Sequence, residues 1–276
     1  MARSGYRAVV EFVEVDGLEI AYERVGAGHP LVLVHGAAAD SRMWRPQLAG
    51  LADEFTVVAW DEPGAGRSCD LPERSTLARF ADLLAALIES LRLGPAHVAG
   101  LSWGGTVVLE LYDRDPQLVS TLILIDTYAG WKGSLPADEV EARVAGGRRM
   151  LAAPPEEFDA AALPGLFAGE PPVDFAPLLG AIAADVRPAT LEQELAIMAG
   201  TDLSGLLPGI AAPTLLIWGD SDVRSPLTVA RQFEQAIPDT VLVVIEGAGH
   251  MSNVERPEQV NAAVREFCHA HPPRAN

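Results

Sequence analysis

Largely apolar runs of four to six residues recur along this chain, and most are followed by a segment with helical spacing. These runs lie at 30–34, 55–60, 96–99, 121–125 and 213–218. A strand without polar alternation is covered on both faces, as in the centre of a parallel sheet. Because such strands alternate with helices, the sequence predicts an α/β fold: a mostly parallel central sheet with helices on both faces.

The first strands are expected to form a hairpin. Residues 9–15 and 18–24 alternate apolar and charged side chains around a two-residue turn, Asp16 and Gly17, which is typical of a β-hairpin with one wet face. Helices are expected at 44–51, 77–91, 106–112, 227–236 and 257–269, and a last strand at 240–245.

The pattern changes between residues 128 and 209. No convincing apolar strand is found there, and helices are expected near 137–151, 175–184 and 190–199. The segment carries too many apolar side chains to be a solvated linker. We therefore expect an α/β core at 1–127 and 210–276, with 128–209 inserted as a helical cap over the carboxyl edge of the sheet.

The overall composition of the chain disfavours some classes of binding partner. The chain has 276 residues, of which 49 % are hydrophobic, and 38 acidic against 20 basic residues give a formal charge of −18. This length and hydrophobic content fit one large α/β domain with an insertion. The strong negative charge disfavours nucleic acid and anionic membranes as partners.

A cytoplasmic location is expected. Cys69 and Cys268 lie far apart and form no disulfide or metal-spaced framework. The apolar run near the N-terminus is broken by Glu11 and Glu14, unlike a signal peptide, and no apolar window is long enough to span a bilayer. The sequence does not indicate the oligomeric state.

One stretch carries a recognisable catalytic pattern. Ser102 stands where the strand at 96–99 gives way to the helix at 106–112, with Gly100 and Gly104 two residues on either side. Glycines there remove the Cβ atoms that would clash in so sharp a bend. This is the G-x-S-x-G nucleophile elbow, which exposes the serine hydroxyl above the sheet and aims helix amides at whatever it attacks.

Four further loops follow predicted strands and complete a family signature. They are His35–Gly36, the D-x-x-G-x-G-x-S loop at 61–68, Gly219 with Asp222, and Gly247 with Gly249 and His250. Together with the elbow they resemble the α/β-hydrolase superfamily over nearly the whole chain outside the insertion. The order serine, acid, histidine is the one expected of that fold.

The resemblance assigns a base to the serine. A serine hydroxyl needs an imidazole within hydrogen-bond reach, and His250 is the candidate. His35 lies at the same edge of the sheet, but in this family that histidine orders the oxyanion loop. The remaining histidines lie within or before strands or near the tail.

The imidazole needs an anion to fix its tautomer. Asp222 matches the family position, while Asp220 and Asp126 stay open as alternatives, Asp220 as a residue that caps its loop. Backbone amides of Ala37 and Trp103 match the oxyanion hole of the family. Substrate contacts are expected from these residues: His35, Gly36, Trp103, Tyr128 and Trp131. Asp61 and Arg67 are expected to brace their loop.

The nucleophile separates subgroups of the superfamily. A serine disfavours epoxide hydrolases and haloalkane dehalogenases, which carry an aspartate there, and Ala37–Ala39 after His35–Gly36 departs from the His-Gly-Gly-Gly loop of one large esterase and lipase group. The chain most resembles small lidded ester and lactone hydrolases, including 3-oxoadipate enol-lactonase-like enzymes, to which the stretch 222–226 is similar.

This resemblance implies a serine hydrolase that cleaves a carboxylic ester or lactone of a small, largely apolar substrate through an acyl-enzyme on Ser102. No metal or organic cofactor is implied. Carbon–carbon bond hydrolases, proline iminopeptidases and cofactor-free haloperoxidases of the same fold are alternatives. A small-molecule receptor with slow hydrolysis is a further one, because fold does not fix function.

Overall fold

The computed structural model describes residues 9–71, 74–152 and 164–273. Part of the N-terminal segment, and residues 153–163 of the predicted insertion, lie outside these ranges. Eight strands form one sheet in the order β1-β2-β4-β3-β5-β6-β7-β8. They are β1 (Val10–Val15), β2 (Leu18–Val25), β3 (His29–Val34), β4 (Phe55–Trp60), β5 (Ala96–Leu101), β6 (Val119–Ile125), β7 (Thr214–Gly219) and β8 (Thr240–Ile245).

The sheet is parallel except at one end. β1 and β2 form the predicted antiparallel hairpin, and β2 pairs antiparallel with β4. From β4 onwards every neighbouring pair is parallel; Val32 of β3, for example, is paired with Val58 on one side and Val98 on the other. The predicted mostly parallel α/β sheet is confirmed.

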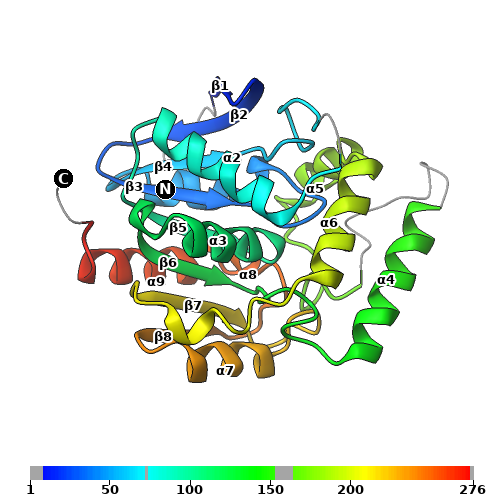
Figure 1. Ribbon diagram of the computed structural model, residues 1–276. Helices are drawn as coiled ribbons and strands as arrows, with labels where there is room; N and C mark the ends of the chain where they lie inside the picture. Colours follow the sequence, from blue (N-terminus) through cyan, green and yellow to red (C-terminus); the bar gives the residue numbers. More distant parts are fainter. Residues whose placement is uncertain (1–8, 72–73, 153–163, 274–276) are drawn as a thin grey trace.

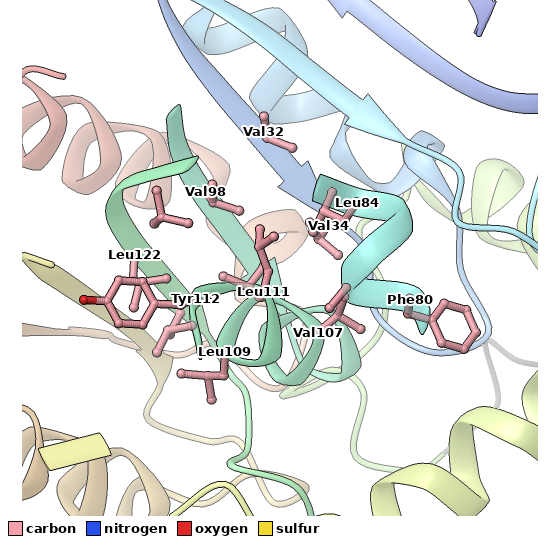
Figure 2. Packing of buried hydrophobic residues seen from close by; sticks show 14 of the residues in the cluster. Val32, Val34, Phe80, Leu84, Val98, Val107, Leu109, Leu111, Tyr112 and Leu122 are labelled. Carbon is pink, nitrogen blue, oxygen red and sulfur yellow. The ribbon is translucent and has the colours of Figure 1, made fainter. Parts of the chain in front are cut away.

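Successive side chains of each central strand enter two different cores, because neighbouring residues of a strand point to opposite faces. On β3, Val32 and Val34 belong to one buried cluster, while Leu31 and Leu33 belong to the other. Figure 2 shows part of the first cluster, in which strand residues meet helix residues: Val32, Val34, Val98 and Leu122 with Phe80, Leu84, Val107, Leu109, Leu111 and Tyr112.

Helices cover both faces of the sheet (Figure 1). The first cluster is closed by α2 (Leu77–Ser90), α3 (Trp103–Arg114) and α7 (Leu227–Ala236). The second is closed by α1 (Arg45–Leu51), α8 (Ser252–Glu255) and α9 (Pro257–Ala270). Short 3₁₀ turns lie at Ser41–Trp44, Pro116–Leu118 and Leu207–Gly209. Among the described helices, none is both long and apolar enough to cross a membrane.

The segment between β6 and β7 is helical in its described part. It contains α4 (Ala137–Leu151), α5 (Ala176–Ala184) and α6 (Pro188–Gly200), where the sequence predicts helices. Figure 1 shows these three helices gathered at one side of the sheet. Phe175, Leu179 and Ile182 of this segment join the second core cluster, so the segment is packed against the sheet domain.

Candidate active site

Ser102 sits at a strained bend between β5 and α3. Its backbone has φ 53° and ψ −118°, a left-handed conformation that is costly for a residue with a side chain. A Cβ atom on Gly100 would lie 2.5 Å from the carbonyl oxygen of Gly104, and one on Gly104 would lie 2.3 Å from that of Val34. The bend therefore requires glycine at both positions.

Ser102, His250 and Asp222 form a continuous hydrogen-bonded series, although they come from the loops after three different strands. The Ser102 Oγ to His250 Nε2 distance is 2.9 Å, and the His250 Nδ1 to Asp222 Oδ2 distance is 2.8 Å. A carboxylate only accepts, so Nδ1–H donates to Asp222 and leaves Nε2 to accept the Ser102 hydroxyl proton. The imidazole thereby presents Nε2 to the serine hydroxyl.

The Asp222 carboxylate is itself held by the backbone. Its Oδ1 accepts the amide N–H groups of Arg224 (2.7 Å) and Ser225 (2.9 Å), while its Oδ2 accepts from the imidazole. Asp222 and His250 are both buried, at 4 % and 3 % exposure. The side chain of the acid is therefore fixed before any substrate arrives.

The other two candidate acids point elsewhere. The fully buried Asp126 accepts from the hydroxyl of Ser252 (2.6 Å), and burial, followed by the charge of Asp222, raises its pKa well above the usual value. Asp220 is exposed, and its Oδ1 accepts the amide of Gly247 (3.0 Å). Of the three aspartates, Asp222 is the one whose carboxylate reaches the imidazole.

The amides of Trp103 and Ala37 are the two predicted from the sequence to form an oxyanion hole. Trp103 is the first residue of α3, so its N–H has no partner within the helix. Ala37 lines the same cavity as Ser102. The next amide in that loop, Ala38 N–H, donates to Glu194 Oε2 of α6 at 3.3 Å, which ties the loop after β3 to the helical segment.

The side chains of His35 and Trp103 are turned into the protein. His35 is buried; its Nδ1 lies 2.9 Å from the Gly36 carbonyl oxygen, and its Nε2 accepts the Glu62 amide at 3.1 Å. Because the carbonyl accepts and the amide donates, the ring is neutral with the proton on Nδ1. The Trp103 indole N–H donates to Glu62 Oε2 at 2.8 Å. Neither side chain lines the cavity next to Ser102.

This cavity has a volume of about 380 Å³, within the range of small-molecule sites. Ser102, His250, Gly36 and Trp131 line it, together with residues of α4 and α6. The predicted contact residue Tyr128 does not line it; its buried hydroxyl accepts from the cavity-lining Arg143 at 2.9 Å, and burial raises the pKa of that hydroxyl to about 12.

The loop at 61–68 is braced by its own charges. The Arg67 guanidinium donates to Asp61 (2.7 Å) and to Glu23 (3.0 Å), and Asp61 also accepts the amide of Ser41 (2.8 Å). These groups lie within the loop and the sheet rather than in the cavity. Within the described ranges, no group of three or more His, Cys, Asp or Glu side chains is arranged to hold a metal ion.

Four charged residues near the site escaped the sequence-based prediction. Glu62 lies inside the recognised loop at 61–68, and Arg224 stands two residues after Asp222, so their neighbourhood could have drawn attention to them. Arg143 and Glu194 lie on helices of the 128–209 segment. No motif marks those helices, and their placement depends on packing.

Comparisons with known proteins agree with the fold. A family model described as the alpha/beta hydrolase fold matches residues 29–257. The chain is 33 % identical to the dihydrolipoyllysine-residue acetyltransferase component of the acetoin cleaving system of Pseudomonas putida, over 94 % of this chain and 69 % of that protein.

Solved structures are similar over nearly their whole length. A thermophilic esterase from Thermogutta terrifontis has 30 % identity and a TM-score of 0.80, covering 96 % of this chain and 100 % of that one. The enol-lactonase from Burkholderia xenovorans has 25 % identity and a TM-score of 0.78, covering 94 % and 100 %.

Proposed function

The chain belongs to the alpha/beta hydrolase family, and from that premise we propose that it is a serine hydrolase acting on a carboxylic ester or lactone. The observation that carries this proposal is the series from Ser102 Oγ through His250 to Asp222, with distances of 2.9 and 2.8 Å. A serine, a base and an orienting acid in hydrogen-bond contact are what nucleophilic acyl transfer requires.

The mechanism follows from these contacts. Ser102 Oγ attacks the carbonyl carbon while His250 Nε2 takes the hydroxyl proton, and Asp222 stabilises the imidazolium. In this proposal the carbonyl oxygen becomes an oxyanion that accepts hydrogen bonds from the amides of Ala37 and Trp103. Collapse breaks the bond to the alkoxy group, which leaves with the proton from His250. Water, deprotonated by the same imidazole, then releases the acid from Ser102.

Residues 128–209 act in this proposal as a cap. Arg143, Leu191 and Leu195 from its helices line the cavity together with Ser102, so substrate choice rests on this segment as well as on the core. A cavity lined by two parts of the chain shields the reacting carbonyl from much of the solvent and strengthens electrostatic interactions there. The role of the cap is supported by this shared lining.

An ester or lactone bond is favoured over other bonds by two similarities. The solved esterase and the enol-lactonase both match over their whole length. Backbone amides beside Ser102 suit a carbonyl substrate, and His250, once it has taken the serine proton, can pass that proton directly to an alkoxide leaving group.

A covalent label tests the proposal. A fluorophosphonate probe should add one organophosphorus group to Ser102, located by peptide mass spectrometry. Ser102→Ala should fold normally, remain unlabelled and lose ester turnover by several orders of magnitude. Ser221→Ala, an exposed serine of the loop after β7, is the matched control and should stay fully active.

Two outcomes would reject the proposal. One is near-native turnover by Ser102→Ala on short-chain esters. The other is a single burst without turnover in the wild-type protein on a panel of methyl esters and lactones, which is the behaviour of a receptor with slow hydrolysis.

A further inference from the structure

Two arginine side chains line the cavity next to Ser102. Arg143 comes from α4, and Arg224 comes from the loop after β7. The described residues that line this cavity include no aspartate or glutamate, although the whole chain has a formal charge of −18. A cationic wall in an acidic protein favours an anionic ligand at that wall.

Arg143 has its charge matched within the protein. It forms an ion pair with Glu139 one helical turn away and donates to the hydroxyl of Tyr128 at 2.9 Å. It also donates to the backbone carbonyl of Arg224. Its guanidinium carbon lies 5.5 Å from the ring centroids of Tyr128 and Trp131. Arg143 is therefore fixed in place and supports the backbone at position 224.

The Arg224 side chain is not matched in this way. In the described part of the chain its recorded side-chain hydrogen bond is one long contact, from Nη1 to the Pro164 carbonyl oxygen at 3.3 Å, and its Nε is buried without a partner. Asp222, two residues earlier in the chain, is engaged by the imidazole and by backbone amides. Burial, with the charge of Arg143 adding to it, lowers the pKa of Arg224. A half-buried cation with spare donors is stabilised by an anion that enters the site.

The remainder of the cavity is apolar. Aliphatic and thioether side chains from the core and from the helical segment line it: Met43, Leu101, Leu166, Leu191, Leu195 and Met251. A ligand that fits both parts has a short aliphatic portion between an anionic end at Arg224 and a reacting carbonyl at Ser102.

We propose that Arg224, held by Arg143, binds a carboxylate of the substrate, so that the ester or lactone cleaved at Ser102 carries a free acid group. This rests on the proposed function. The planar guanidinium offers two parallel N–H donors, which match the two oxygens of a carboxylate. The proposed substrate differs from the small, largely apolar one expected from the sequence, because it carries both an apolar portion and a carboxylate.

Binding to an inactive variant tests the carboxylate site without any turnover. Ser102→Ala is titrated in a calorimeter with three half-esters, monomethyl succinate, glutarate and adipate. Each is paired with the neutral ester in which a methyl group replaces the carboxylate, such as methyl pentanoate for monomethyl glutarate. At least one half-ester should bind about 10- to 100-fold more tightly than its neutral partner, the scale of a hydrogen bond between charged groups.

Second substitutions identify the residue responsible. Adding Arg224→Gln to Ser102→Ala should remove this selectivity and leave binding of the neutral ester within about threefold, while Arg224→Lys should restore part of it, because the charge remains but the planar fork is lost. Arg231→Gln is the matched control: this arginine of α7 is 54 % exposed and pairs with Glu234. It should keep the full selectivity.

The outcomes separate the two proposals. Equal binding of every half-ester and its neutral partner overturns the carboxylate site, as does an Arg224→Gln change that weakens both esters equally. Selective binding without methanol release by the Ser102-containing protein upholds the carboxylate site and rejects the hydrolase. Methanol release from methyl pentanoate without preference for monomethyl glutarate, succinate or adipate upholds the hydrolase alone.

Discussion

Glu62, in the loop after β4, and Glu194, on α6, are two acidic residues buried close enough for the charge of Glu194 to act on Glu62. They are 0 % and 2 % exposed. Two like charges close together in a buried site repel each other, so the protonated form of Glu62 is favoured. Burial, followed by repulsion from Glu194, raises the pKa of Glu62 well above its usual value.

This pair should make the protein less stable as pH rises. A carboxyl whose pKa is raised by folding contributes full stability below the pKa of the unfolded chain, about 4.3, and that contribution is lost as pH rises through the higher folded pKa. Glu62→Gln keeps a neutral group at every pH. From pH 5 to pH 8 the melting temperatures of both proteins should fall. The fall for Glu62→Gln should be smaller than the fall for the wild type, with a difference of about 2–4 °C.

Differential scanning calorimetry measures this difference. Glu141→Gln, an exposed glutamate of α4, is the control and should follow the wild-type pH profile. Parallel profiles for wild type and Glu62→Gln would exclude Glu62 as the titrating group.

The buried imidazole of His97 should make the protein sensitive to acid. Burial, with smaller effects from neighbouring histidines, lowers its pKa to about 4, and its Nδ1 lies 2.8 Å from Thr121 Oγ1. A histidine with a lowered pKa contributes full stability above the unfolded value of about 6.5. That stability is lost as pH falls from there toward 4, by about 3 kcal/mol at 1.36 kcal/mol per pKa unit.

Urea denaturation of His97→Asn tests this. The variant is expected to be less stable at pH 7, because packing against Phe55 is lost, yet to lose less stability than the wild type between pH 7 and pH 4. A variant that loses as much as the wild type over this range would exclude His97 as the titrating group.

Adding one methyl group at Gly104 of the elbow should destabilise the protein. Gly104→Ala places a Cβ 2.3 Å from the Val34 carbonyl oxygen and 2.4 Å from that of His35, so backbone must shift. We expect a loss above about 3 kcal/mol of unfolding free energy, as for overpacking of a rigid core. Gly180→Ala in α5 meets no atom within 4 Å and should instead gain about 0.5–1 kcal/mol. Equal effects in urea denaturation would contradict this account of the bend.

The three aspartates at this edge of the sheet should differ in catalysis. Asp222→Asn leaves an amide that can turn the imidazole to the wrong tautomer, so kcat on a short ester should fall on the order of 10³–10⁴-fold. Asp220→Asn, which changes an exposed loop contact, should stay within about threefold of the wild type. If Asp222→Asn lowered kcat only slightly and Asp126→Asn lowered it strongly, Asp126 after β6 would be the catalytic acid instead.

The fold could be predicted because two signals in the sequence identify its strands. The strands are apolar, and the segments that follow most of them have the spacing of helices. Leu31 to Val34 are all apolar because their side chains alternate between the two buried cores, so none of them faces water. The nearness of Ser102, Asp222 and His250 results from that sheet, because loops after parallel strands meet at one edge. Their catalytic roles remain proposals.

The contacts of the helical segment could not be predicted in the same way. The residues of α6 buried against the core are Thr190, Leu191, Glu194 and Met198, so a glutamate stands in the buried stripe where helical periodicity predicts an apolar residue. Its partner Glu62 is far away in the sequence. Arg143 likewise lies on a helix whose rotation is set by packing, and no local pattern distinguishes it from a solvated arginine.

Position 224 joins two tasks through different atoms. Its backbone N–H holds the Asp222 carboxylate at 2.7 Å, whereas its side chain lines the cavity. Every amino acid except proline supplies that N–H. A substitution at 224 can therefore change which ligand charge the cavity favours. The backbone hydrogen bond that positions the Asp222 carboxylate is kept.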